Sequence, residues 1–281
     1  MAEARILYIA TAEGLVQLAN PGKSDRWREI GRALTEQDLR AVVASPNDPL
    51  LALAASSAGI SRSANGGMSW DLVLAEPIRS LVFDAAATLY ASAERGTLLR
   101  SADGSDWVAV ARLPAPILGW SLLEDGTLIG VSVDGRLYQQ IGAEWQARDA
   151  QVLEPLAITA DPSDPEALLI VGTRSLYTPQ GEQPLPAAAT GALLMLRGQQ
   201  PVLLLATHEA LLRSDDRGAT GAPVEGPTGV TVLVTPPRFI DQVFAGTAQG
   251  ALWFSADRGR TWAELRAGYP AIHGVAFARA L

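Results

Sequence analysis

Short apolar or alternating segments recur along the chain, each bounded by Gly, Asp or Ser. Within residues 76–113 four such pieces follow one another: IRSLVFD, TLYASAE, TLLRSAD and WVAVARL. Segments of this length with a two-residue hydrophobic period and turn residues at their ends are typical of antiparallel β-strands. The stretch therefore predicts one unit of four short strands.

The unit repeats with a period of about 40 residues. Trp27, Trp70, Trp107 and Trp145 are 43, 37 and 38 residues apart, and Trp262 follows Trp145 by 117 residues, which is three steps of 39. A turn followed by apolar alternation recurs independently at seven places. Four strands repeated seven times predict an all-β fold, the seven-bladed β-propeller with four antiparallel strands per blade.

The two ends of the chain complement each other. Residues 4–34 have the pattern of three outer strands without an innermost one, and residues 271–281 have that of a single innermost strand. We expect the two segments to share blade 1, which would close the ring and remove two unpaired strand edges. The prediction is one propeller domain over residues 1–281. A capping-box pattern in TEQDLRAVV, residues 35–43, leaves a helix there as an alternative.

One pattern stands out among the turns. It reads SADRGRTW at 255–262 and SANGGMSW at 63–70, with partial copies SADGSDW at 101–107 and SDDRGAT at 214–220. The Asp or Asn can accept hydrogen bonds from turn amides, the glycine can take a positive φ, and the tryptophan can be buried under a neighbouring blade. We expect a structural role for Ser63, Asn65, Gly67, Trp70, Ser101, Asp103, Trp107, Ser214, Asp216, Gly218, Ser255, Asp257, Gly259 and Trp262.

This pattern resembles the Asp-box, or BNR repeat, Ser-x-Asp-x-Gly-x-Thr-Trp. The whole chain resembles the compact seven-bladed propellers of the sortilin, photosystem II assembly-factor and sialidase-like superfamily. The resemblance implies that the boxes join the third and fourth strands of a blade, at the periphery and away from the face that usually binds ligands.

The composition and net charge of the chain argue against several classes of protein function. With 48% apolar and 19% charged residues and no apolar run of about 18 residues, the chain is expected to be a soluble globular protein without a transmembrane helix. The N-terminus lacks a basic leader and a long apolar region, so a cytoplasmic location is expected. No cysteines and only two histidines leave little material for a metal site or a serine triad, and no metal or cofactor is expected. A net charge of −8 opposes nucleic-acid binding.

Propellers bind ligands at the central opening, near the starts of the innermost strands. Alignment of the units places Arg40, Arg79 and His273 at one equivalent position in three adjacent blades, where other units have Leu118, Leu156 and Thr231. Three converging cations would form an anion-binding cluster. In the alternative, each side chain is solvated and pairs with a nearby carboxylate such as Asp38 or Glu76.

The expected function is a non-catalytic, monomeric scaffold that binds a protein, a peptide or a small anionic ligand. The alternative is a glycoside hydrolase of the sialidase or xyloglucanase-like type. A sialidase would need an Arg-Ile-Pro motif near its start, whereas the nearest match, Arg112-Leu113-Pro114, follows three units. No Tyr–Glu pair can be identified from the sequence, and units of this length leave no long insertions to build a deep pocket.

Overall fold

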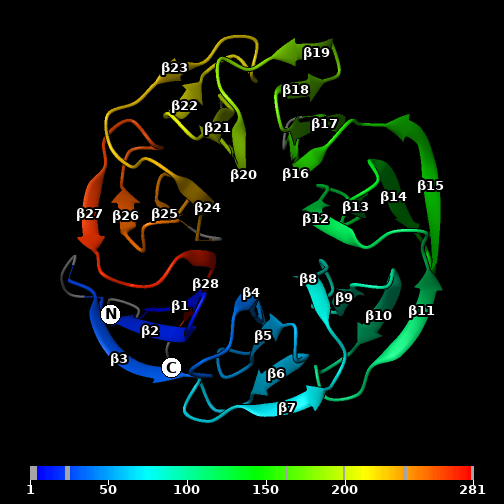
Figure 1. Ribbon diagram of the computed structural model, residues 1–281, viewed down its shortest axis with the longest axis vertical. Coiled ribbons are helices and arrows are strands. Elements are labelled where there is room, and N and C mark those ends of the chain that lie inside the picture. The colour runs from blue at the N-terminus through cyan, green and yellow to red at the C-terminus, as the bar shows by residue number, and fades with distance from the viewer. Residues whose placement is uncertain (1–4, 23–25, 162–163, 199, 237–238, 280–281) are drawn as a thin grey trace. The chain divides into compact units, whose positions relative to one another are not determined.

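The computed structural model describes residues 5–22, 26–161, 164–198, 200–236 and 239–279. These ranges contain 28 β-strands and no helix, so none of their segments is a helix that could cross a membrane. The strands pair into seven four-stranded sheets. The fold is a seven-bladed β-propeller, as the hydrophobic period predicts (Figure 1).

The chain divides into two compact units, residues 1–116 with 269–281 and residues 117–268. The first unit holds three blades. Blade 1 consists of β28 (Ile272–Arg279), β1 (Arg5–Thr11), β2 (Gly14–Asn20) and β3 (Arg28–Ala33). Blade 2 consists of β4 (Leu39–Ala44), β5 (Ala52–Ser56), β6 (Ile60–Ser63) and β7 (Asp71–Leu74). Blade 3 consists of β8 (Ile78–Phe83), β9 (Leu89–Ala93), β10 (Thr97–Ser101) and β11 (Val108–Arg112).

The second unit holds four blades. Blade 4 consists of β12 (Ile117–Leu122), β13 (Leu128–Ser132), β14 (Arg136–Ile141) and β15 (Glu144–Gln151). Blade 5 consists of β16 (Pro155–Asp161), β17 (Asp164–Gly172), β18 (Ser175–Thr178) and β19 (Gly181–Pro184). Blade 6 consists of β20 (Ala189–Leu196), β21 (Val202–Thr207), β22 (Leu211–Ser214) and β23 (Ala222–Pro223). Blade 7 consists of β24 (Val230–Val234), β25 (Val243–Thr247), β26 (Leu252–Ser255) and β27 (Ala263–Arg266).

In blades 2, 3, 4, 6 and 7 the second strand is the best buried. Every residue of β5, β9 and β21 is buried, because such a strand lies in a sheet whose two faces both pack against other blades. The fourth strands are largely exposed, as in β11 and β27. The apolar clusters therefore lie between consecutive sheets rather than within one sheet.

Blade 1 combines both ends of the described chain. Strand β28 pairs antiparallel with β1, from Arg5 opposite Arg279 to Thr11 opposite Ile272. The predicted sharing of blade 1 by the two terminal segments is confirmed. The helix alternative for residues 35–43 is wrong, since Leu39–Ala44 pairs with β5 and Leu34 and Glu36 before it take positive φ values of 51° and 66°.

The four turns that begin at Ser63, Ser101, Ser214 and Ser255, called the serine turns below, each join the third and fourth strands of a blade. In blade 7 the Ser255 hydroxyl accepts a hydrogen bond from Gly259 N at 2.9 Å and donates one to Asp257 Oδ1 at 2.8 Å. Asp257 accepts further bonds from Thr261 N at 2.9 Å and Thr261 Oγ1 at 2.6 Å. Gly259 has a φ of 77°, which a residue with a Cβ resists.

The other serine turns repeat these contacts. In each, the serine hydroxyl accepts from the turn glycine at 2.8 Å: Gly67 in blade 2, Gly104 in blade 3 and Gly218 in blade 6. Asn65, Asp103 and Asp216 accept from the amides of Ser69, Ser105 and Thr220. Blades 2, 6 and 7 therefore share one turn geometry, and blade 3 has a version one residue shorter, with the glycine three residues after the serine instead of four.

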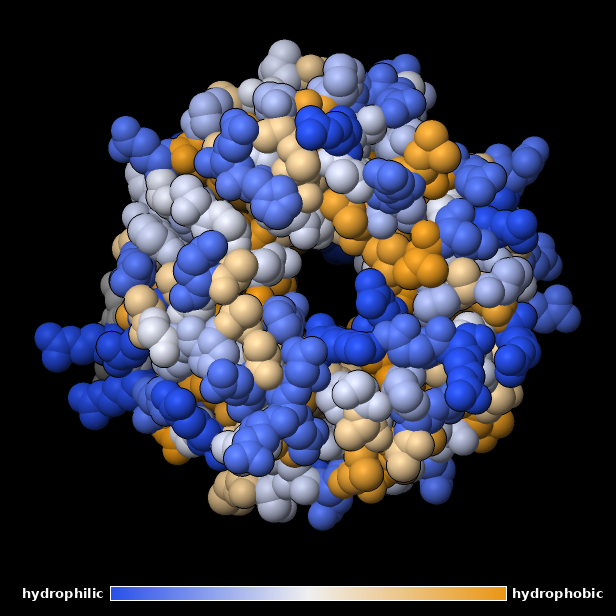
Figure 2. Space-filling view, viewed as in Figure 1, coloured by the Kyte–Doolittle hydropathy of each residue, from blue (hydrophilic) through white to orange (hydrophobic). Residues whose placement is uncertain are grey.

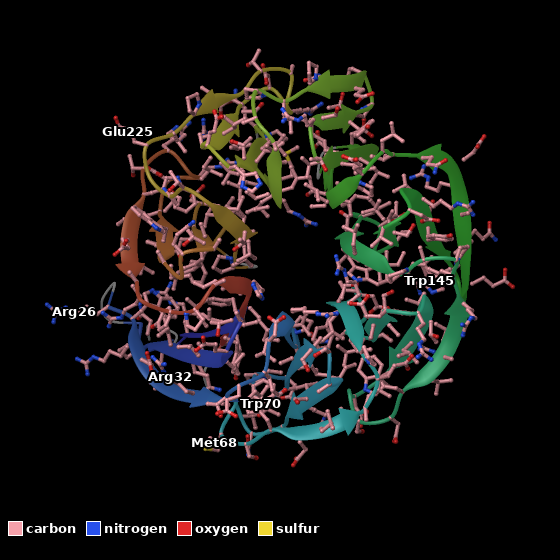
Figure 3. The ribbon with its side chains drawn as sticks, in the orientation of Figure 1. Arg26, Arg32, Met68, Trp70, Trp145 and Glu225 are labelled. Carbon is pink, nitrogen blue, oxygen red and sulfur yellow. The ribbon has the colours of Figure 1, made fainter. Side chains whose placement is uncertain are left out.

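The turn tryptophans are less buried than the sequence led us to expect. Each donates its indole N–H to the carbonyl of the turn glycine: Trp70 to Gly67 at 3.2 Å, Trp107 to Gly104 at 3.1 Å and Trp262 to Gly259 at 3.1 Å. All three are only half-buried. One side of the ring packs on the preceding blade, as Trp70 does on Tyr8 at 6.1 Å between ring centroids, while the outer edge remains near solvent (Figure 3).

Removal of residues 271–281 tests how much blade 1 depends on β28. The truncation exposes the edge of β1 and the apolar surface that β28 covers. We expect the midpoint of thermal unfolding to fall by about 10 °C or more, because several kcal/mol of packing are lost. A truncated chain that unfolds at the same temperature as the full chain would contradict this view of blade 1.

Asp257→Ala should lower the free energy of unfolding by about 1–3 kcal/mol, since turn amides lose their acceptor. Although desolvation raises the pKa of Asp257, the bonds from Thr261 and Ser255 outweigh it and lower the pKa overall. Because the pKa of Asp257 is lower in the folded state, its charged carboxylate stabilises the fold above the unfolded-state pKa of about 3.9. This stabilisation is lost as the pH falls, so the cost of Asp257→Ala should shrink below that pH. Urea unfolding at pH 7 and pH 3 measures both effects, with exposed Glu264→Ala as control. An equal cost at both pH values would argue against the carboxylate's role.

Trp262→Ala should cost about 1.5–3 kcal/mol, below the value for a fully buried tryptophan because the ring is half-buried. Trp262→Phe keeps an aromatic ring but removes the indole donor, and should cost about 0.5–1.5 kcal/mol. Chemical denaturation of both variants checks the order. If the phenylalanine variant were as unstable as the alanine variant, ring packing would not be the main contribution.

Candidate anion-binding site

Arg40, Arg79 and His273 are the second residues of three first strands, β4, β8 and β28, all in the first unit. Strand β4 packs beside β28 on one side and beside β8 on the other. The alignment of repeats therefore placed the three residues at equivalent positions of neighbouring strands. Whether they form one functional site depends on what their side chains contact.

A β-bulge sets the direction of each of these side chains. In blade 2, Leu39 is opposite Ser56 and Ala41 is opposite Ala55, so Arg40 has no partner in the ladder. The register skips Arg79 between β8 and β9, and His273 between β28 and β1, in the same way. Bulges re-aim a side chain and are common beside active or binding sites. The sequence reasoning found the position but not this backbone feature.

Glu94 joins the two arginines and was missed by the sequence analysis. Its Oε1 atom contacts Nη1 of Arg40 and lies 4.0 Å from Nη1 of Arg79. The side chains of Arg40, Glu94 and Arg79 are 31%, 33% and 45% exposed, so solvent screens the charges only in part. One carboxylate thus lies between guanidinium groups from two neighbouring strands.

Glu94 occupies the position directly after the second strand of its blade, where Glu94 N donates to Pro77 O at 2.9 Å. Four other blades make the same backbone contact, through Ala12, Thr173, His208 and Ala248. A comparison of these five residues in the sequence would have revealed Glu94 as the one with a carboxylate. Its pairing with Arg40, 54 residues away, could not be read from local pattern.

His273 has a different environment. Its Nδ1 atom lies 3.0 Å from the carbonyl oxygen of Leu39 and 3.2 Å from Asp38 Oδ1. Since both neighbours are acceptors, Nδ1 carries the hydrogen, and Nε2 of the neutral ring is left as an acceptor. His273 therefore contacts Asp38 and Leu39, whereas the two arginines share Glu94.

The side-chain contacts match neither the expected cluster of three cations nor the alternative in which each side chain pairs with its own carboxylate. The arginines share Glu94 instead of pairing separately with Asp38 and Glu76, while Asp38 pairs with His273. A surface hollow adjoins the cluster, lined by Leu74, Ala75, Glu76, Pro77, Glu94 and Arg95. Figure 2 shows hydrophilic surface over the starts of β4 and β8. The site is polar, accessible and bounded by two strands of fixed geometry.

The second unit has no charged residue at the equivalent bulge positions of its described strands. Leu118, Leu156 and Thr231 stand there as predicted, and blade 6 has Thr190. Thr231 Oγ1 donates to Gly246 O at 3.1 Å, and Thr190 Oγ1 donates to Val230 O. These two hydroxyls are hydrogen-bonded to backbone carbonyl oxygens. Among the described strands, charged side chains at this bulge position therefore occur in the first unit.

The described contacts of Arg40 and Arg79 include neither a tyrosine nor Arg112. Tyr177 and Glu182 face each other across β18 and β19, but burial, followed by the charge of Glu182, raises the pKa of Tyr177. A tyrosine nucleophile needs the opposite shift. Arg112 ends the exposed fourth strand of blade 3. The described residues contain no group of three His, Asp or Glu side chains placed to hold a metal ion.

Neither a protein-family model nor a curated protein sequence matches the chain. Similar solved structures share its fold. A chain of the complex of BBS1N with ARL6DN has a TM-score of 0.64 at 17% identity, covering 90% of this chain and 93% of that one. A chain of the nidogen/laminin complex has a TM-score of 0.60 at 11% identity, covering 98% of both. The GH74 enzyme of Niastella koreensis has 0.58 at 14% identity, covering 98% of this chain and 59% of that one.

Proposed function

We propose that this protein is a non-catalytic propeller scaffold whose first unit binds an acidic segment of a protein partner. The observation that carries the proposal is the placement of Arg40 and Arg79 on bulges of adjacent first strands, with Glu94 between them. The three side chains together carry a net charge of +1, in a chain whose net charge is −8. An acidic segment is attracted to this local positive charge and repelled by most of the remaining surface.

Glu94 has a positioning role in this proposal. A guanidinium group has five N–H donors in a rigid fork, and the contact with Glu94 uses only part of the fork of Arg40. Glu94 restricts the arginine rotamers, which lowers the entropic cost of binding a second carboxylate. The donors that remain on Arg40 and Arg79 can then bind a partner's carboxylate in a bidentate manner.

A protein partner suits the fold better than catalysis does. The similar nidogen/laminin and BBS1N–ARL6DN structures are complexes of proteins, whereas the likeness to the GH74 enzyme is one of fold alone at 14% identity. Tyr177 lies opposite Glu182, and Tyr269 donates to Glu29 at 3.3 Å. Neither pair is among the described contacts of Arg40 and Arg79. We therefore place the glycoside hydrolase second and use it as an outcome of the test.

The serine turns are part of the proposal as Asp-box repeats with a structural role. Four copies make the same Ser–Gly and Asp or Asn contacts, each inside its own turn. Their hydrogen-bonding groups are consumed within the turn, which supports stability rather than ligand binding. On this view the seven blades form one domain, and binding is carried by the first strands.

Calorimetric titration with citrate and with a short Asp/Glu-rich peptide tests the proposal. We expect saturable binding of the peptide that weakens as salt rises from about 50 to about 200 mM. The Arg40→Ala/Arg79→Ala double variant should lose about tenfold or more in affinity. Glu94→Gln should strengthen binding several-fold, because the amide oxygen can still accept from Arg40 and hold its rotamer while a competing negative charge is removed.

The matched control is Arg100→Ala/Arg112→Ala, which removes two exposed arginines from β10 and β11 and changes net charge equally. It should retain affinity within about twofold. Full peptide affinity in the Arg40/Arg79 variant would refute the site. Binding of citrate without the peptide would indicate a small-ligand site. Turnover of chromogenic glycosides that is lost in the same variant would favour the hydrolase.

A further inference from the structure

Blade 6 departs from the serine-turn pattern at one position. Its turn keeps Ser214, Asp216, Gly218 and Thr220 with their hydrogen bonds. The tryptophan follows the serine by seven residues in blades 2 and 7, but the same count from Ser214 leads to Gly221. The scaffold of the turn is therefore complete, while its aromatic side chain is missing.

The intact turns show what that side chain does. In blade 7, Trp262 joins the apolar cluster between blades 6 and 7, which includes Leu204 and partly buried Val224. A Cβ on Gly226 would lie 2.8 Å from Trp262 Cβ, so the indole fills the space beside the chain that links the two blades. Trp107 and Trp70 join the corresponding clusters of blades 3 and 2.

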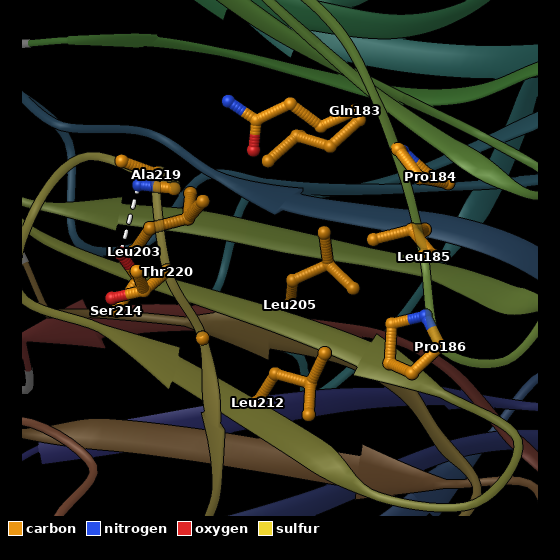
Figure 4. A pocket seen from close by; sticks show the side chains of 13 residues that line it. Gln183, Pro184, Leu185, Pro186, Leu203, Leu205, Leu212, Ser214, Ala219 and Thr220 are labelled. Atoms are coloured by element: carbon orange, nitrogen blue, oxygen red, sulfur yellow. Dashed lines mark hydrogen bonds between the residues drawn. The ribbon is translucent and has the colours of Figure 1, made fainter.

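An apolar pocket of about 140 Å³ lies at the matching place between blades 5 and 6. Its buried floor is formed by Leu176, Leu203 and Leu205, which are 4%, 2% and 3% exposed. Residues 183–186 form one wall and residues 218–221 the other (Figure 4). Leu212 also lines it, at the position that Trp253 occupies in blade 7. Two large aromatic side chains of blade 7 are thus replaced by Leu and Gly in blade 6.

We propose that this pocket binds a tryptophan side chain of a partner protein, which takes the place of the missing turn tryptophan. The chain itself supplies the template for the occupant, because the equivalent space beside three other serine turns holds an indole. The site is separate from the arginine cluster and does not depend on that proposal.

Size and polarity support an indole. An apolar cavity of about 150 Å³ in another protein accommodates benzene, so the volume here suits a flat aromatic group. The three intact turns each accept an indole N–H at the carbonyl of the turn glycine, at 3.1–3.2 Å. Gly218 supplies the carbonyl at this place in blade 6. An indole that enters can therefore make both the apolar contacts and the hydrogen bond.

The mouth of the pocket is open to a partner. Pro184, Pro186, Ala219, Thr220 and Gly221 are exposed, whereas the leucines of the floor are buried. A side chain that projects from another polypeptide can pass between these rims without movement of the blade core. Tryptophan is also among the residue types enriched in side chains that dominate binding energy, with tyrosine and arginine.

Titration with N-acetyltryptophanamide, followed by backbone amide NMR shifts of residues 219–221, tests the site. We expect saturable shifts at millimolar concentration. Gly221→Trp should weaken binding more than about tenfold and raise the unfolding temperature, because the pocket is filled from within. Gly221→Ala is the matched control and should change affinity less than about twofold, since the new Cβ would lie 3.7 Å from Leu212 Cβ, an ordinary contact.

Leu212→Trp fills the pocket from a second position and repeats the test if Gly221→Trp does not fold. The 1-methylindole analogue of the probe cannot donate the hydrogen bond and should bind about two- to tenfold more weakly. N-acetylphenylalaninamide should bind more weakly for the same reason. Unchanged binding in a folded variant that fills the pocket would overturn the site. Binding of free indole without N-acetyltryptophanamide would overturn the partner side chain as its occupant.

Discussion

Burial of both faces of the second strand of a blade, complete in five of the seven blades, is the constraint on which the rest of the structure depends. Strands such as β5, β9 and β21 are buried throughout, so a single sheet cannot satisfy them and neighbouring sheets must cover both sides. This requirement explains the apolar clusters between consecutive blades. It also explains the serine turns, whose tryptophans extend the same contacts toward the outer strands. The blades differ from one another in sequence where this burial is not needed, at the bulges of the first strands and at the turn of blade 6.

The repeat pattern predicted the fold because strand period, turn residues and tryptophan spacing are local properties that recur. It also placed Arg40, Arg79 and His273 at equivalent positions, since aligned repeats share register. It missed Glu94, whose contact with Arg40 spans 54 residues. The half-burial of the turn tryptophans was missed for a similar reason, because exposure depends on the neighbouring blade. The pocket of blade 6 could be suspected from Gly221, but its volume required the surrounding leucines in three dimensions.

The arginine cluster and the blade 6 pocket arise from the same principle of a regular scaffold with local exceptions. At Arg40 and Arg79, the bulge frees a side chain from the ladder, and the sequence supplies a charged group where other blades have Leu or Thr. At Gly221, the turn geometry is kept and the side chain is absent. In both cases backbone hydrogen bonds fix the geometry, so under the two proposals substitutions there should alter binding more than fold.

A crystal structure with an Asp/Glu-rich peptide bound tests the central claim most directly, because it reports which groups the partner's carboxylates contact. The account predicts carboxylate oxygens within about 3 Å of guanidinium nitrogens of both Arg40 and Arg79. It further predicts that Glu94 remains within contact of at least one arginine. A peptide seated elsewhere, with the Arg40–Glu94 pair unchanged and no anion beside Arg79, would contradict the account.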